Sequence, residues 1–135
     1  MGQVGVILLD TNALLWLISD PARLSPPATA IIEQARAEHE ELAIVDISLL
    51  EIAKLVRKGR LGIQMYLESV LDEVQSRIAV KPITSRACLK TLELPPNYPK
   101  DPADRIIGAT ALAEGIPLVT ADEKIRKTKA FATIW

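Results

Sequence analysis

The chain has 135 residues, a formal net charge of −1 and a hydrophobic fraction of 49%. This length and composition are typical of one globular domain, 1–135, and exclude a disordered chain. The sequence holds no apolar run near the roughly 20 residues of a membrane span, no recognisable secretory leader and one cysteine, which cannot form an internal disulfide. We therefore expect a cytoplasmic protein without membrane contact.

Apolar runs and helix signals alternate along the chain. The continuously apolar segment 5–9 predicts a strand buried on both faces of a sheet. Further strands are predicted at 42–45, 77–82, 116–120 and the terminal FATIW. Apolar stripes and capping residues predict helices over 12–19, from Ser25, from Ser48 to near Gly59, over 63–74, over 85–92, from Pro102 and after Thr120. This alternation predicts an α/β fold of three layers, in which helices flank a parallel sheet of four to five strands.

Four acidic residues stand where an apolar run passes into the start of a helix: Asp10, Glu51, Asp104 and Asp122. In an α/β sheet, the carboxyl ends of strands and the amino ends of helices share the edge where ligands bind. Two carboxylates about 5 Å apart repel by roughly 3 kcal/mol at an effective dielectric constant of about 20. Four carboxylates on one rim therefore predict a site for a hard divalent ion, Mg²⁺ or Mn²⁺.

Local capping offers an alternative explanation for two of these acids. Ser48 and Glu51 have the spacing of a capping box, and so do Thr120 and Glu123, which would leave Asp122 in the first turn of a helix. Acidic residues in a first turn are common because they favour the helix dipole. Taken singly, each residue fits either a cap or a metal ligand.

Burial favours the metal interpretation for the other two acids. Asp10 lies between apolar runs and could cap the following helix. Asp104 opens the nearly all-apolar segment 106–113 and could simply favour the helix dipole. An acid so close to a core is costly unless it is paired or metal-bound. In KDPADRII, Asp101 precedes Pro102 and is suited to be the N-cap. Asp104 then lies inside the first turn and is expected to face the metal.

Other catalytic chemistries find little support. The only histidine, His39, lies in a polar helix tail, and no glycine-rich phosphate loop is present. Cys88 falls in an amphipathic helix and is predicted to be a small buried hydrophobe. Trp16 and Trp135 flank apolar runs and are expected to belong to the core.

Several motifs resemble those of PIN-domain nucleases, specifically the VapC-type toxins of bacterial or archaeal toxin–antitoxin pairs. The motifs are LLDTNALLWL, SLLEIAKLVRKGRL, KDPADRIIGATALAEGIPLVTADEKI and the terminal TIW, which together run from Val6 to Trp135. The resemblance places the acidic quartet on the same four residues and implies supporting polar roles for Thr11, Asn12 and Thr120.

The chain departs from the family pattern before SLLE. Small residues usually end that strand, whereas Val45 and Asp46 stand there in this chain. Asp46 adds a possible fifth carboxylate, which could face the rim or cap the next helix.

The resemblance implies a metal-dependent endoribonuclease with RNA as substrate, a small cognate antitoxin and a homodimer. Because an acidic site cannot attract RNA unaided, we expect Lys54 and Lys58 to contact phosphates, since they follow Glu51 on the same helical stripe. The segment from Ala28 to Val74 is expected to supply exposed apolar residues for an interface. The alternatives are a catalytically degenerate PIN-like binding module and a metal-dependent phosphatase.

Overall fold

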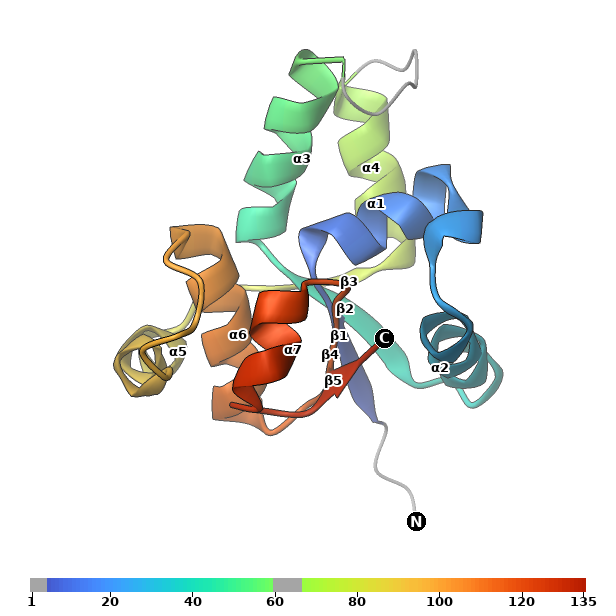
Figure 1. Cartoon of the computed structure of the whole chain (residues 1–135). Helices are drawn as coiled ribbons and strands as arrows, with labels where there is room; N and C mark the ends of the chain where they lie inside the picture. The colour runs from blue at the N-terminus through green and yellow to red at the C-terminus, as the bar shows by residue number, and fades with distance from the viewer. Residues whose placement is uncertain (1–4, 60–66) are drawn as a thin grey trace.

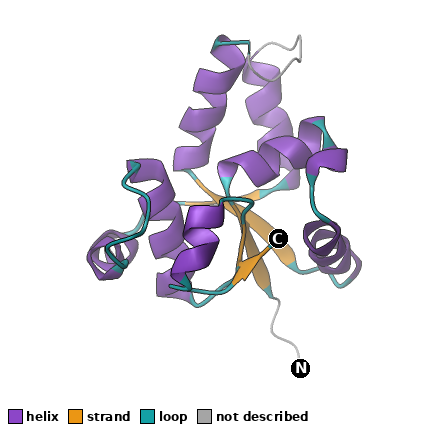
Figure 2. Ribbon diagram, viewed as in Figure 1, coloured by secondary structure: helices purple, strands orange, loops and turns teal. Residues whose placement is uncertain are grey.

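The computed structural model describes residues 5–59 and 67–135. Its centre is a five-stranded sheet in the order β3-β2-β1-β4-β5, in which all neighbouring strands are parallel. The strands are β1 (Val6–Leu9), β2 (Glu41–Val45), β3 (Ala79–Lys81), β4 (Leu118–Val119) and β5 (Thr133–Ile134). Figures 1 and 2 show helices on both sides of this sheet, which confirms the predicted three-layer α/β architecture.

The helices follow the predicted order with shifted ends. They are α1 (Thr11–Ser19), α2 (Pro26–Ala37), α3 (Ile47–Arg57), α4 (Leu67–Arg77), α5 (Ser85–Lys90), α6 (Pro102–Glu114) and α7 (Glu123–Thr128), with short 3-10 turns η1 (Pro21–Arg23) and η2 (Thr91–Glu93). The expected helix over 63–74 corresponds to α4, and its residues 63–66 lie outside the described residues. In the described ranges, every helix is too short or too polar to cross a membrane.

The sheet is buried on both faces because its central strands carry apolar side chains on both of them, apart from the exposed Glu41 at the start of β2. Along β1, Ile7 and Leu9 belong to the core beneath α1–α4, whereas Leu8 belongs to the core beneath α6 and α7. Along β2, Leu42 and Ile44 face the first core, and Ala43 and Val45 the second. This explains why the strands read as continuous apolar runs rather than alternating ones.

The order in which strands are added to the sheet changes side at β1. From β1 the sheet grows one way to β2 and β3, and the other way to β4 and β5. Open α/β sheets bind ligands outside the carboxyl ends of the strands at such a switch point. Asp10 follows β1 directly, and Thr120 follows β4, so both lie at this point.

One burial prediction was wrong. Cys88 is exposed, and its neighbour Ala87 is the buried residue of α5, with 1% of its surface exposed. Because α5 has only six residues, its apolar stripe is too short for sequence to fix which side chain faces inward. Trp16 and Trp135 pack partly buried against the core, with ring centroids 5.6 Å apart.

Candidate active site

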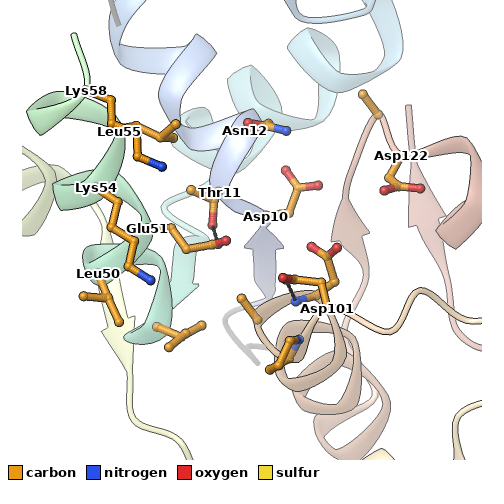
Figure 3. A pocket seen from close by; sticks show the side chains of 15 residues that line it. Asp10, Thr11, Asn12, Leu50, Glu51, Lys54, Leu55, Lys58, Asp101 and Asp122 are labelled. Atoms are coloured by element: carbon orange, nitrogen blue, oxygen red, sulfur yellow. Dashed lines mark hydrogen bonds between the residues drawn. The ribbon is translucent and has the colours of Figure 1, made fainter. Parts of the chain in front are cut away.

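A pocket of about 670 Å³ lies at the switch point of the sheet. It is lined by all four acids of the predicted quartet, together with Thr11, Asn12, Ile47, Leu50, Lys54, Leu55, Lys58, Asp101, Pro102, Ala103 and Ala121. Figure 3 shows side chains from α1, α3 and the starts of α6 and α7 converging on it. Residues far apart in sequence therefore meet at the edge of the sheet that the strand–helix alternation predicts.

Asp10 and Asp122 occupy the N-cap positions of α1 and α7. The Ala13 amide donates a hydrogen bond to Asp10 Oδ1 over 2.8 Å, and the Ile125 amide donates one to Asp122 Oδ1 over 3.0 Å. Capping therefore does not compete with a site role, because it engages one oxygen and leaves the other. It also fixes each side chain by a backbone contact.

Asp104 reaches the pocket by a different arrangement. Asp101 is the N-cap of α6, as predicted, and its Oδ2 accepts a hydrogen bond from the Asp104 amide over 3.1 Å. Pro102 occupies the first helical position, where its missing N–H costs nothing. Because Asp101 does the capping, the Asp104 carboxylate in the first turn is not needed for it.

Glu51 is held by a hydrogen-bond chain instead of a capping box. The Thr11 hydroxyl donates a short hydrogen bond to Glu51 Oε1, and the hydroxyls of Thr11 and Ser48 lie 2.8 Å apart. Since the Thr11 proton is directed to Glu51, Ser48 must donate to Thr11. The capping box proposed for Ser48 and Glu51 is therefore absent, and α3 begins one residue earlier than expected, at Ile47.

Thr120 connects two of the acids. It is fully buried, and its hydroxyl oxygen accepts a hydrogen bond from the Asp122 amide over 3.1 Å. The same hydroxyl acts to lower the pKa of the Asp10 side chain. The alternative capping box of Thr120 with Glu123 is wrong, because Asp122 is the cap of α7 and Glu123 pairs with Lys127 at 3.1 Å.

Asp46 does not line the pocket. Its Oδ2 accepts a hydrogen bond from the Ile83 amide over 3.3 Å, and its side chain makes no capping bond to α3. Of its two expected roles, facing the rim or capping the helix, the structure supports neither. It instead ties the start of α3 to the segment after β3.

The α3 side of the pocket differs from the acidic side. Lys54 and Lys58 both line the pocket and are exposed, as is Leu50, which is 51% exposed. Figure 3 shows these side chains along α3, opposite Asp122. The α3 wall thus carries positive charge and apolar surface beside Glu51, whereas the other three acids come from the starts of α1, α6 and α7.

The carboxylates strongly influence one another. Burial, and then the charges of Asp122 and Glu51, raise the pKa of Asp10 from 3.8 to about 6, although hydrogen bonds from Thr120 and Ala13 oppose the rise. Burial and four neighbouring acids, Asp101 first, raise the pKa of Asp104 to about 7. A positive ion placed among these groups would relieve both effects.

The donor set fits a hard divalent cation in its chemistry. All the acids present oxygen ligands, which Mg²⁺ and Mn²⁺ prefer, and Asp10, Glu51 and Asp122 each have one oxygen held by a protein donor. Within residues 5–59 and 67–135, no three acidic, histidine or cysteine side chains already enclose a metal position.

One residue close to the pocket was not predicted from the sequence. Tyr98 lies in the proline-rich segment before α6, is 2% exposed, and donates a hydrogen bond to the backbone oxygen of Asp104 over 2.9 Å. Burial, and then the charges of Asp104, Asp122 and Asp10, raise its pKa well above the ordinary value. The only signal in the sequence is a lone aromatic residue among prolines.

Comparisons with known proteins agree with this geometry. The profile of the PIN domain matches residues 7–130. The chain is 34% identical to Ribonuclease VapC22 of Mycobacterium tuberculosis (strain ATCC 25618 / H37Rv), over 96% of this chain and 98% of that protein.

Solved structures share the fold at lower identity. A DNA-bound VapBC from Salmonella typhimurium has a TM-score of 0.73 at 19% identity, with 97% of each chain covered. VapBC2 from Rickettsia felis, bound to a DNA fragment from its promoter, has a TM-score of 0.72 at 20% identity, with 95% of this chain and 96% of that chain covered. At these identities the likeness shows a common fold.

Proposed function

The chain belongs to the PIN-domain family, and from this premise we propose that it is a divalent-metal-dependent endoribonuclease. The observation that carries the proposal is the pocket in which four carboxylates from four separate segments converge beside two lysines of α3. The relative from Mycobacterium tuberculosis, matched along almost its whole length, is named a ribonuclease, which supports RNA as the substrate.

Asp10, Glu51, Asp104 and Asp122 would hold Mg²⁺ or Mn²⁺. When bound, such an ion supplies the positive charge that polarises a phosphodiester and makes water a better nucleophile at neutral pH. Thr11 orients Glu51 through its hydrogen bond to Oε1, and Thr120 supports the start of α7 at Asp122 through its hydrogen bond with the Asp122 amide. Asn12, which is exposed on the pocket wall, can reach substrate from α1.

Removal and return of the metal tests the proposal directly. Purified protein should cleave RNA with Mg²⁺ or Mn²⁺, lose activity in EDTA and regain it when either ion is added in excess. A phosphomonoester incubated in parallel should remain intact. Full cleavage in EDTA would contradict the acidic-site mechanism. Turnover of the phosphomonoester alone would favour a phosphatase, and metal binding without any turnover a degenerate binding module.

The lysine wall gives a second test. Lys54 and Lys58 should contact phosphates, so replacing either by alanine should weaken RNA binding at every sequence. It should also reduce the slope of log affinity against log salt concentration by about 0.7 to 1 per lysine. Lys124→Ala is the matched control, because Lys124 is exposed on α7 and does not line the pocket. Equal effects at Lys54 and Lys124 would indicate only general charge attraction.

We also propose that the chain is the toxin of a toxin–antitoxin pair, binds a small cognate antitoxin and forms a homodimer. Support comes from neighbours of the same fold whose names describe VapBC complexes. Exposed large apolar residues suit an interface, namely Leu50, Leu67, Ile83, Leu89 and Leu92. Of these, only the first two fall in the expected segment 28–74. A monomer by light scattering at high concentration, or no copurifying product of a neighbouring small reading frame, would contradict this assignment.

A further inference from the structure

The start of α6 is fixed from outside the helix by Tyr98. The Tyr98 hydroxyl donates to the backbone oxygen of Asp104 over 2.9 Å. Its own backbone is fixed by a turn in which the Tyr98 amide donates to the Pro95 oxygen over 2.9 Å. The proline-rich segment therefore contacts the one turn of α6 that carries a pocket carboxylate.

Helix α6 leaves space for this side chain. A Cβ atom added at Gly108 would lie 2.1 Å from the Tyr98 hydroxyl oxygen and 2.7 Å from the adjacent ring carbon. Glycine inside a helix is unfavourable relative to alanine, and α6 is otherwise rich in alanine. Glycine at position 108 therefore allows the Tyr98 phenol to lie close to the backbone of α6.

Packing alone does not require the hydroxyl. The Tyr98 ring lies against Phe131, with centroids 6.2 Å apart, and belongs to the core beneath α6 and α7. A phenylalanine would provide the same apolar contacts. What the hydroxyl adds is a directed bond to Asp104, the residue whose side chain opens on the pocket.

We propose that Tyr98 is a positioning residue for the acidic site. Its hydroxyl fixes the first turn of α6 so that the Asp104 carboxylate is presented to the other acids, which raises the affinity for a divalent cation. This inference rests on the proposed metal-dependent function. It concerns a residue that does not itself touch metal or substrate.

The test compares two variants that each lose one hydroxyl bonded to a carbonyl of α6. Tyr98→Phe removes the bond to Asp104. Thr110→Val removes the 2.8 Å bond from Thr110 Oγ1 to the Ile106 oxygen. The Thr110 and Tyr98 side chains are both 2% exposed, and this bond does not involve Asp104. Both variants should fold and lose similar, modest stability without metal.

Titration with Mn²⁺ and Mg²⁺ by calorimetry should separate the two variants. Tyr98→Phe should bind either ion about tenfold more weakly, the lower end of the effect of residues that orient metal ligands, whereas Thr110→Val should bind as the unmodified protein does. The ion concentration for half-maximal RNA cleavage should rise in Tyr98→Phe, and saturating ion should restore the rate.

Any other result of the titrations would contradict either the positioning role of Tyr98 or the proposed function. Equal affinity in Tyr98→Phe and the unmodified protein would refute the positioning role alone. Equal weakening in Thr110→Val would show that any loosening of α6 has this effect, and would refute it as well. If the unmodified protein bound neither ion, the proposed function itself would fail, and the inference with it.

Discussion

Asp104 and Asp122 reach the same pocket from the starts of two helices, α6 and α7, but the two helix starts are built differently. Asp122 is itself the N-cap, and one of its oxygens accepts the Ile125 amide. At α6, Asp101 caps the helix and Asp104 stands three residues further on. An acid that caps its own helix is held in place by the backbone, whereas the position of Asp104 depends on its neighbours.

Substitutions that remove the charge of a pocket carboxylate but leave the helix cap intact should have the largest effect on RNA cleavage. Asp104→Asn and Asp10→Asn should each lower RNA cleavage by more than about 100-fold, beyond the usual cost of losing a ligand-supporting residue. Neither variant should be less stable than the unmodified protein, because Asp104 caps no helix and asparagine caps as well as aspartate at position 10. At pH 7 without metal both should gain stability, since each removes a carboxyl whose pKa the fold raises. Cleavage rates at saturating metal and urea unfolding measure the two effects. Activity within tenfold of normal in Asp104→Asn would remove this residue from the site.

The pH dependence of stability should reveal the cost of ionising Asp10 and Asp104, which are buried close to other acids. The folded chain holds protons on Asp10 up to about pH 6 and on Asp104 up to about pH 7, whereas the ordinary pKa is 3.8. Between these limits the unfolded chain has released protons that the folded chain keeps. The free energy of unfolding of the metal-free protein should therefore fall as pH rises from about 4 to about 7.

Asp10 alone should account for up to about 3 kcal/mol of that loss. The difference in unfolding free energy between the unmodified protein and Asp10→Asn isolates its share, since the variant keeps the cap. Saturating Mg²⁺ should flatten the curve. A difference that grows in favour of the unmodified protein between pH 4 and pH 7 would have the opposite sign and would contradict the raised pKa.

The dedicated cap should show the smallest effects. Asp101→Ala should cost about 1 kcal/mol of stability through the lost hydrogen bond to the Asp104 amide. Asp101→Asn should preserve both stability and cleavage, because asparagine caps equally well. Thermal unfolding and cleavage assays on the two variants suffice. If Asp101→Asn were as inactive as Asp104→Asn, Asp101 would be a fifth acid of the site.

Sequence predicts those parts of the site that depend on order along the chain. The strand–helix alternation brings the four acids to one edge, and proline after Asp101 identifies the cap of α6. Sequence fails where a contact from another element replaces a local one. The capping box of Ser48 and Glu51 does not form, because the Glu51 carboxylate accepts a hydrogen bond from Thr11, which lies 40 residues earlier in the chain.

Two further features are hidden for similar reasons. Tyr98 gains its role through a bond to Asp104 and through the space at Gly108, and neither feature forms a periodic pattern. The inward face of the short α5 is decided by its packing on α6, so its sequence gives no way to choose Ala87 over Cys88.

The central position of β1 in the sheet has a consequence for synthesis. The Asp10 amide donates a hydrogen bond to the Val119 oxygen over 3.2 Å, so β1 is completed by a strand that the ribosome makes long after β1 itself. Asp122 is made later still. A growing chain that stops short of α7 has no assembled pocket, whatever else has folded.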